Sequence, residues 1–231
     1  MTLDEYVDSI KNKSIAVVGL GVSNRPLIEL LLRRGCRVSA RARRDGEKLG
    51  DYAKLLRALG AELHLGEDYL EGLTEELIFR TPGLMPFEEH LSAAGSRGSV
   101  LTSEMEVFLS LCPCKVIAVT GSDGKTTTST IIAQLLVAAG HRVHLGGNIG
   151  HPLLCETPEI EKDDICVLEL SSFQLHSMRC HPDVAVITNL SPNHLDKHRD
   201  FQDYADAKRS IFESQGPEDT LVLNLDDAYS A

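Results

Sequence analysis

The sequence lacks the features by which membrane and secreted proteins are recognised. No apolar run approaches the roughly 20 residues that a helix needs to cross a bilayer. The N-terminal segment MTLDEYVDSIKNK is acidic and amphipathic, and it has none of the basic-then-apolar order of a signal peptide. We therefore expect a cytoplasmic protein without a membrane partner.

Positive charge is also scarce. The 23 lysines and arginines are outnumbered by 34 aspartates and glutamates, which gives a formal net charge of -11 at pH 7. This balance argues against a broad surface for nucleic acid, although it allows a local site for a nucleotide. With 231 residues, 42% of them hydrophobic, the chain is long enough for one large domain or two of ordinary size. We expect a monomer with no nucleic-acid partner.

The cysteines form no CxxC pair. All six are scattered through a chain of moderate length, which favours reduced, buried thiols over disulfides. They are Cys36, Cys112, Cys114, Cys155, Cys166 and Cys180. We interpret the CPC segment at 112–114 as a connector rather than a ligand pair.

Apolar, β-branched runs alternate with helical patterns through most of the chain. Such alternation is typical of an α/β protein whose parallel sheets are covered on both faces. Strands are expected at residues 15–19, 37–40, 77–80, 116–120, 165–170, 184–189 and 220–224, and helices over 24–35, 128–140 and 201–212.

Two openings of the form strand, glycine turn and helix, at 15–34 and 116–139, predict two domains in tandem. We place the boundary after the polar segment AAGSRGS, giving a Rossmann-like domain over 1–99 and a P-loop-type α/β domain over 100–231. Because the chain stops directly after the last expected strand, we expect the second domain to be incomplete.

The first glycine turn reads GLGVSN, residues 19–24. The dinucleotide fingerprint has a third glycine where this chain has Asn24. Two glycines still allow the backbone to approach a phosphate at a helix N-terminus, but a plain tight turn between strand and helix has the same pattern. RTPG, residues 80–83, ends another strand with a turn, and its backbone groups are expected to line the same cleft.

The strand that follows this turn runs into a basic segment. An NAD site would have an acidic residue there, to hold the ribose hydroxyls. This chain has Arg41, Arg43 and Arg44 instead. These side chains suit the 2′-phosphate of NADP or form a solvated basic loop, and the sequence leaves both readings open.

The second glycine turn reads GSDGKT, residues 121–126. It is shorter than the usual P-loop, which has four residues rather than two between its first glycine and the Gly-Lys pair. The parts of a phosphate site are still present. Gly121 and Gly124 allow a tight curl with inward N–H groups, Lys125 offers a positive charge, and the Thr126 hydroxyl can ligate Mg²⁺.

The short loop and several other segments together resemble the Mur ligase family. The matching segments are GLGVS, TGSDGKTTT, GGNIG (146–150), LELSSFQL (168–175), NHLDKH (193–198) and AKRSIF (207–212), and they extend over essentially the whole chain. LELSSFQL after GGNIG favours the branch of the family that adds D-glutamate.

The resemblance implies an ATP-dependent amide ligase of peptidoglycan precursor synthesis. In that reaction the carboxylate of UDP-N-acetylmuramoyl-L-alanine takes the γ-phosphoryl group of ATP, and the amine of D-glutamate then displaces phosphate from the acyl phosphate. The transfer needs charge neutralisation, which two Mg²⁺ ions would supply.

The resemblance also implies the roles of individual residues. The catalytic residues would be Lys125, Glu169, His194 and Lys208. ATP would contact Gly121, Ser122, Asp123, Gly124, Lys125, Thr126 and Thr127. The metal ligands would be Thr126, Glu169, His194 and Lys208, the last as a carbamate formed with CO₂. The UDP substrate would contact Gly21, Val22, Ser23, Thr81, Pro82, Gly83 and Asn148.

Two departures from the family pattern affect these roles. The segment SARARR stands where the family often has an acidic residue, which leaves the uracil contacts open. Asp123 stands where asparagine is common. His194 and His198, spaced i, i+4, would also suit zinc on a helix, although no second ligand pair supports that.

The resemblance implies a third domain that holds the D-glutamate site, and we expect this sequence to lack it. We therefore expect the chain alone to bind the UDP substrate, to bind ATP weakly and not to complete ligation. Three alternatives stay open: a ligase of the same family for another amino acid, a non-catalytic NADP-binding module, and a simple P-loop NTPase or kinase.

Overall fold

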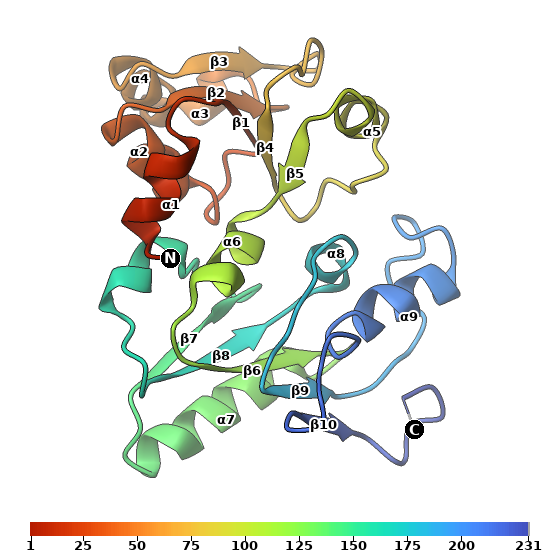
Figure 1. The fold of residues 1–231 in the computed structure, drawn as a ribbon. Helices are drawn as coiled ribbons and strands as arrows, with labels where there is room; N and C mark the ends of the chain where they lie inside the picture. Colours follow the sequence, from red (N-terminus) through yellow and green to blue (C-terminus); the bar gives the residue numbers. More distant parts are fainter. Residues whose placement is uncertain (231) are drawn as a thin grey trace. The chain divides into compact units, whose positions relative to one another are not determined.

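The computed structural model of the protein describes residues 1–230. It contains two compact units, Met1–Val107 and Phe108–Ala231 (Figure 1). Each unit is built on one five-stranded sheet, and all strand pairs in both sheets are parallel. The predicted α/β class with parallel sheets is therefore confirmed.

The first unit has the strand order β3-β2-β1-β4-β5. Its strands are β1 (Ser14–Val18), β2 (Arg37–Ala42), β3 (Glu62–Leu65), β4 (Leu77–Arg80) and β5 (Val100–Thr102), and its helices are α1 (Leu3–Ile10), α2 (Arg25–Arg33), α3 (Gly46–Leu49), α4 (Asp51–Ala58) and α5 (Glu89–Ser96). The central strand β1 reads SIAVV, and its last four residues are fully buried. Burial on both faces explains why this strand is a continuous apolar run rather than an alternating one.

The second unit has the strand order β10-β9-β6-β8-β7. Its strands are β6 (Lys115–Thr120), β7 (Val143–Gly147), β8 (Ile165–Glu169), β9 (Val184–Ile187) and β10 (Thr220–Leu223), and its helical segments are α7 (Lys125–Ala138), η1 (Leu154–Glu159), α8 (Ser172–Leu175) and α9 (Phe201–Arg209). Helix α6 (Glu104–Leu111) contains the division between the units.

All seven predicted strands and all three predicted helices are present. Three strands were not predicted, and each gives a weak signal. β3 is only half-buried, β5 has three residues, and β7 ends in two glycines. β5 pairs with β4, so residues 100–102 lie in the first sheet, and the division between the units falls after Val107 rather than after residue 99.

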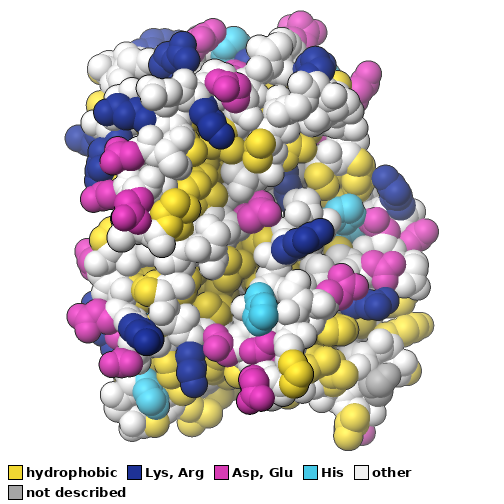
Figure 2. All heavy atoms as spheres, in the orientation of Figure 1, with side chains coloured by type: hydrophobic (Ala, Val, Ile, Leu, Met, Phe, Trp, Pro, Cys, Tyr) yellow, Lys and Arg dark blue, Asp and Glu magenta, His cyan; other side chains and the backbone are white. Residues whose placement is uncertain are grey.

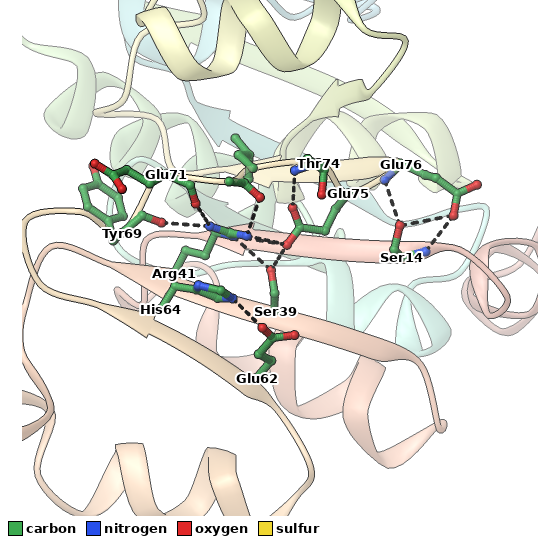
Figure 3. Close-up of polar contacts among 12 residues, drawn as sticks. Ser14, Ser39, Arg41, Glu62, His64, Tyr69, Glu71, Thr74, Glu75 and Glu76 are labelled. Carbon is green, nitrogen blue, oxygen red and sulfur yellow. Dashed lines mark hydrogen bonds and ion pairs between the residues drawn. The ribbon is translucent and has the colours of Figure 1, made fainter.

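A buried ion pair of the first unit joins Arg41 of β2 to Glu75, which lies just before β4. Arg41 Nη2 is 2.8 Å from Glu75 Oε1, and Arg41 is only 2% exposed. Figure 3 shows the guanidinium between Ser39, Glu75 and the backbone before β4. Arg41 therefore belongs to the interior of the unit, which the basic pattern of SARARR did not predict.

The surface carries charges of both signs. On the face drawn in Figure 2, basic and acidic side chains are interspersed rather than gathered by sign. Among the described residues, no helix is long and apolar enough to cross a membrane.

Candidate functional site

The GSDGKT loop joins the carboxyl end of β6 to the N-terminus of α7. Gly121 has φ 149°, and a Cβ there would lie 1.9 Å from Thr188 Oγ1. Gly124 is the N-cap of α7 and has φ 77°, in the left-handed region that favours glycine. The two glycines are thus needed for different reasons. Gly121 lets the loop approach Thr188 closely, and Gly124 adopts a left-handed backbone conformation.

The loop is anchored to the end of the neighbouring strand β9. The N–H groups of Ser122 and Asp123 donate to Asn189, at its carbonyl (2.9 Å) and its Oδ1 (3.0 Å) respectively. Thr188 Oγ1 in turn donates to the Asp123 carbonyl at 2.6 Å. An α-helix leaves its first N–H groups without intrahelical partners, so the amides available to an anion are those at the start of α7, from Lys125 to Thr127.

The loop's lysine curls back over the turn. Lys125 Nζ donates to the carbonyls of Gly121 (3.0 Å) and Ser122 (2.9 Å). Lys125 is half-buried. The ammonium therefore lies at the mouth of the loop, beside the N-terminus of α7, where it can turn towards an anion.

Two predicted site residues, Thr126 and Asn148, meet at a third, Glu169, which is the last residue of β8. Thr126 Oγ1 donates to Glu169 Oε2 at 2.5 Å, and Asn148 Nδ2 donates to Glu169 Oε1 at 2.8 Å. Glu169 is 2% exposed. The Thr126 hydroxyl and the Glu169 carboxylate are oxygen ligands of the kind that Mg²⁺ prefers, so these two residues fit the cation, and the Asn148 amide orients the carboxylate through its NH₂ group.

The turn after β7 holds the Glu169 backbone. The N–H of Asn148 donates to the Glu169 carbonyl at 2.8 Å. Gly147 has φ 97°, and a Cβ there would lie 2.2 Å from that same carbonyl oxygen. The glycines of GGNIG thus allow Asn148 to reach the carboxylate.

Lys208 of α9 is buried, with 1% exposure. Its Nζ donates to the Gly121 carbonyl at 2.8 Å and to Thr120 Oγ1 at 3.3 Å. The Gly121 carbonyl therefore accepts from both Lys125 and Lys208. Burial, followed by the positive charge of Lys125, lowers the pKa of Lys208 to about 7.

His194, another predicted ligand, lies in the segment between β9 and α9. It is exposed and has φ 54°. Its ring contacts that of Phe173 in a tilted arrangement, with the ring centroids 5.0 Å apart. Within the part of the chain that the structure describes, no hydrogen bond joins its side chain to Glu169 or Lys208. His198 is buried and is held by Ser172 and Asp203, at 2.9 Å each, so the two histidines do not form a ligand pair here.

The first unit has a cavity of about 250 Å³ at the carboxyl edge of its sheet, lined by Val18, Gly19, Leu20, Gly21, Ala42, Arg43, Arg44, Leu49, Tyr69 and Thr81. Gly21 and Thr81 of the predicted substrate residues line it, whereas Val22, Ser23, Pro82 and Gly83 do not. A Cβ on Gly19 would lie 2.6 Å from Thr81 Cβ, so this glycine lets the two turns meet.

Asn24 replaces the third glycine of the fingerprint with a polar anchor. It is buried, and its Nδ2 donates to the carbonyls of Val18 (3.3 Å) and Gly19 (2.9 Å). Of the three arginines in the basic segment, Arg43 and Arg44 line the cavity, while Arg41 points into the unit's interior.

Sequence reasoning missed Thr188 and Asn189, which anchor the loop, and Tyr204, whose hydroxyl lies 2.9 Å from Ser122 Oγ. A signal for the first two was available. They directly follow an apolar strand whose neighbour ends in the glycine loop, and carboxyl ends of adjacent parallel strands meet at one edge.

Comparison with known proteins finds relatives that match almost the whole chain. Residues 119–231 match the family described as the Mur ligase middle domain. The chain is 48% identical over 224 residues to a UDP-N-acetylmuramoylalanine–D-glutamate ligase of Clostridium botulinum (strain Loch Maree / Type A3), and 50% identical over 226 residues to that of Ruminiclostridium cellulolyticum. These matches cover 96% and 97% of the chain but 49% of each relative, so the chain spans about half the length of these curated relatives.

Solved structures with the same fold are more distant in sequence. The UDP-N-acetylmuramate:L-alanyl-gamma-D-glutamyl-meso-diaminopimelate ligase of Neisseria meningitides superposes with a TM-score of 0.58 at 20% identity, covering 94% of this chain and 72% of that one. The UDP-N-acetylmuramate-alanine ligase of Thermotoga maritima gives 0.53 at 18% identity, with 94% and 50% covered. At these identities the likeness establishes the fold alone. Residues 119–231 thus match the Mur ligase middle-domain family, and almost the whole chain is similar in sequence to the D-glutamate-adding ligases.

Proposed function

We propose that this chain forms part of an ATP-dependent ligase that adds D-glutamate to UDP-N-acetylmuramoyl-L-alanine. The observation that carries the proposal is the Thr126–Glu169–Asn148 group beside the GSDGKT loop. Because the chain spans about half the length of the curated relatives it matches, the activity belongs to the whole protein. ATP as co-substrate also favours a cytoplasmic protein, and we propose that it acts as a monomer.

In the second unit, different residues would bind the triphosphate and the metal during phosphoryl transfer. The N–H groups at the start of α7 and the Lys125 ammonium would hold the triphosphate. Thr126 and Glu169 would hold one Mg²⁺, which when bound neutralises charge on the transferred phosphoryl group. Asn148 would fix the Glu169 carboxylate in its orientation, because its amide already donates to that group.

Lys208 would serve a second Mg²⁺ after reaction of its amine with CO₂. An ammonium repels a cation, whereas the carbamate presents anionic oxygens. Only the neutral amine attacks CO₂: a C–N bond forms, one proton leaves to solvent, and nothing is oxidised. The buried Nζ, 2.8 Å from the Gly121 carbonyl, supports this role. His194 would be a further ligand in the same site.

In the first unit, the cavity beside Gly21 and Thr81 would take the UDP part of the substrate. Arg43 and Arg44 line it and would attract the diphosphate. The same arginines would attract the 2′-phosphate of NADP, so the alternative of an NADP-binding module rests on this cavity too.

The test of the ligase proposal is product formation by the full-length protein with UDP-N-acetylmuramoyl-L-alanine, ATP and a panel of amino acids. Mass spectrometry should find the amide of D-glutamate and release of ADP. An amide of a different amino acid would select another branch of the family. ADP formation without any muramoyl substrate would favour a simple NTPase.

A further inference from the structure

Three cysteines from two distant segments of the sequence meet at the amino-terminal edge of the second sheet. Cys112 and Cys114 lie in the connector between α6 and β6, and Cys166 lies in β8. Their Sγ atoms are 3.7 Å (Cys112–Cys114), 3.7 Å (Cys112–Cys166) and 3.5 Å (Cys114–Cys166) apart. This cluster has no part in the proposed ligase chemistry, which lies at the carboxyl edge of the same sheet.

The sheet register explains why these thiols share one place. Val116 of β6 pairs with Cys166 of β8, and side chains two residues apart on a strand share a face. Cys114 directly precedes β6, two residues before Val116, and its Sγ reaches to 3.5 Å from that of Cys166. Pro113, between the first two cysteines, restricts the turn that brings Cys112 back towards them.

The spacing of the sulfurs suits a tetrahedral thiolate site. With Zn–S bonds of about 2.3 Å, a tetrahedral Zn²⁺ separates its sulfurs by about 3.8 Å, whereas a planar three-sulfur site at that bond length would separate them by about 4.0 Å. The observed distances are nearer to the tetrahedral value. Soft thiolates favour Zn²⁺ over the hard Mg²⁺ of the proposed active site.

We propose that Cys112, Cys114 and Cys166 form a Zn²⁺ site with water as the fourth ligand. Cys166 is buried, while Cys112 and Cys114 are partly exposed, which leaves the metal a solvent-facing position. His144 lies beside Cys166 in the register, but it is not among the residues whose ligand atoms lie within 4.8 Å of one another here, so we do not assign it to the metal. Binding releases the thiol protons to solvent and changes no oxidation state.

The site would join strand β8 to the connector that lies before β6. Since the metal would bind the folded arrangement of three residues that are separated in the unfolded chain, it would stabilise the second unit. The proposal does not depend on the ligase activity and is tested without it.

The experiment titrates the purified, fully reduced protein with Co²⁺ under anaerobic conditions, followed by displacement with Zn²⁺. The expected result is one ion per chain, with the intense visible absorption of tetrahedral Co²⁺ and a sulfur-to-cobalt charge-transfer band. The double variant Cys112→Ala/Cys114→Ala should lose both bands and bind Zn²⁺ at least about 100-fold more weakly, because even outer-shell changes cost about 10–100-fold. It leaves the buried Cys166 in place, so the sheet core is unchanged.

The matched controls are Cys155→Ala and Cys180→Ala, which alter cysteines of the same unit outside the cluster. Both should keep the bands and the affinity. Absence of a one-to-one tetrahedral spectrum in the reduced protein would overturn the proposal and leave the thiols as packing partners only. Equal losses in the controls and the double variant would overturn it as well.

Discussion

Arg41 offers the sharpest test of how the first unit is held together. Its guanidinium donates to Glu75 Oε1 at 2.8 Å and 3.2 Å and to Ser39 Oγ at 3.1 Å. It also donates to three carbonyls, those of Tyr69 (3.1 Å), Glu71 (3.0 Å) and Gly72 (3.3 Å). Figure 3 shows these contacts converging on one side chain.

Arg41→Met should therefore be strongly destabilising. The substitution keeps the apolar stem but leaves Glu75, which is 9% exposed, without its cation, and it leaves three carbonyls without their donor. Removal of one partner from a buried pair costs about 3–5 kcal/mol. The double variant Arg41→Met/Glu75→Leu should recover much of this loss, because no unpaired charge then remains buried.

The matched control is Arg43→Met, two residues further along the same segment. Arg43 pairs with Glu67 at 2.7 Å, but both side chains are exposed, so its loss should leave the unfolding free energy unchanged within error. Urea-dependent hydrogen exchange, read on peptides from β1 and β2, reports the first unit separately from the second. Equal effects of the two substitutions, or a cost below about 1 kcal/mol for Arg41→Met, would refute the reasoning.

The Arg41–Glu75 pair also makes the stability of the first unit depend on pH. Burial raises the pKa of Glu75, but hydrogen bonds from Ser39 and Arg41 outweigh it and hold this pKa below the usual 4.5. A lowered carboxyl pKa contributes stability that is present above the unfolded value and is lost as pH falls through the folded value. The first unit should thus lose stability below about pH 4.5, and the double variant should lose less.

Three further predictions concern the second unit. Lys125→Ala should weaken ATP binding by about 10–150-fold in calorimetry, because a hydrogen bond from a charged group contributes about that much. The control Lys162→Ala changes an exposed lysine and should leave the affinity for ATP unchanged. Equal affinities of the two variants would remove Lys125 from the site. Gly147→Ala should displace Glu169 and abolish Mg²⁺-dependent ATP binding, because the added Cβ would lie 2.2 Å from the Glu169 carbonyl oxygen. The control Gly150→Ala, also at positive φ but with open space around its Cβ, should bind ATP normally. Similar ATP binding by the two variants would contradict this account. In CO₂-free buffer, the stability of the second unit should rise between pH 7 and about 10.5. The reason is that Lys208, with its pKa lowered to about 7, binds fewer protons in the folded than in the unfolded state. Lys208→Met should flatten this pH dependence as measured by hydrogen exchange, and an unchanged slope would show that Lys208 is not its source.

The sequence predicts the framework of both units because parallel strands buried on both faces are continuous apolar runs. β6, reading KVIAVT, and β8, reading ICVLE, show this directly. β7 escapes prediction because VHLGG is only partly buried and ends in glycines. Those glycines are required by the close approach to Glu169, a constraint that the sequence alone does not reveal.

The candidate site is predictable where a residue's role is set by its position at a strand end or a helix start. Glu169 ends β8 and Thr126 lies in the first turn of α7, and the structure joins them at 2.5 Å. Roles set by tertiary packing are not visible in the same way. Arg41 belongs to a basic segment, yet it is buried because Glu75 lies opposite it, and Cys166 meets the CPC connector only through the register of β6 and β8.

The central claim is that the first unit binds the UDP-sugar of a ligase rather than a dinucleotide. Calorimetric titration of the protein with UDP-N-acetylmuramoyl-L-alanine, with NADP in parallel, tests it most directly. We predict saturable binding of the UDP-sugar, with one site per chain, and no heat from NADP. Binding of NADP without binding of the UDP-sugar would contradict the account.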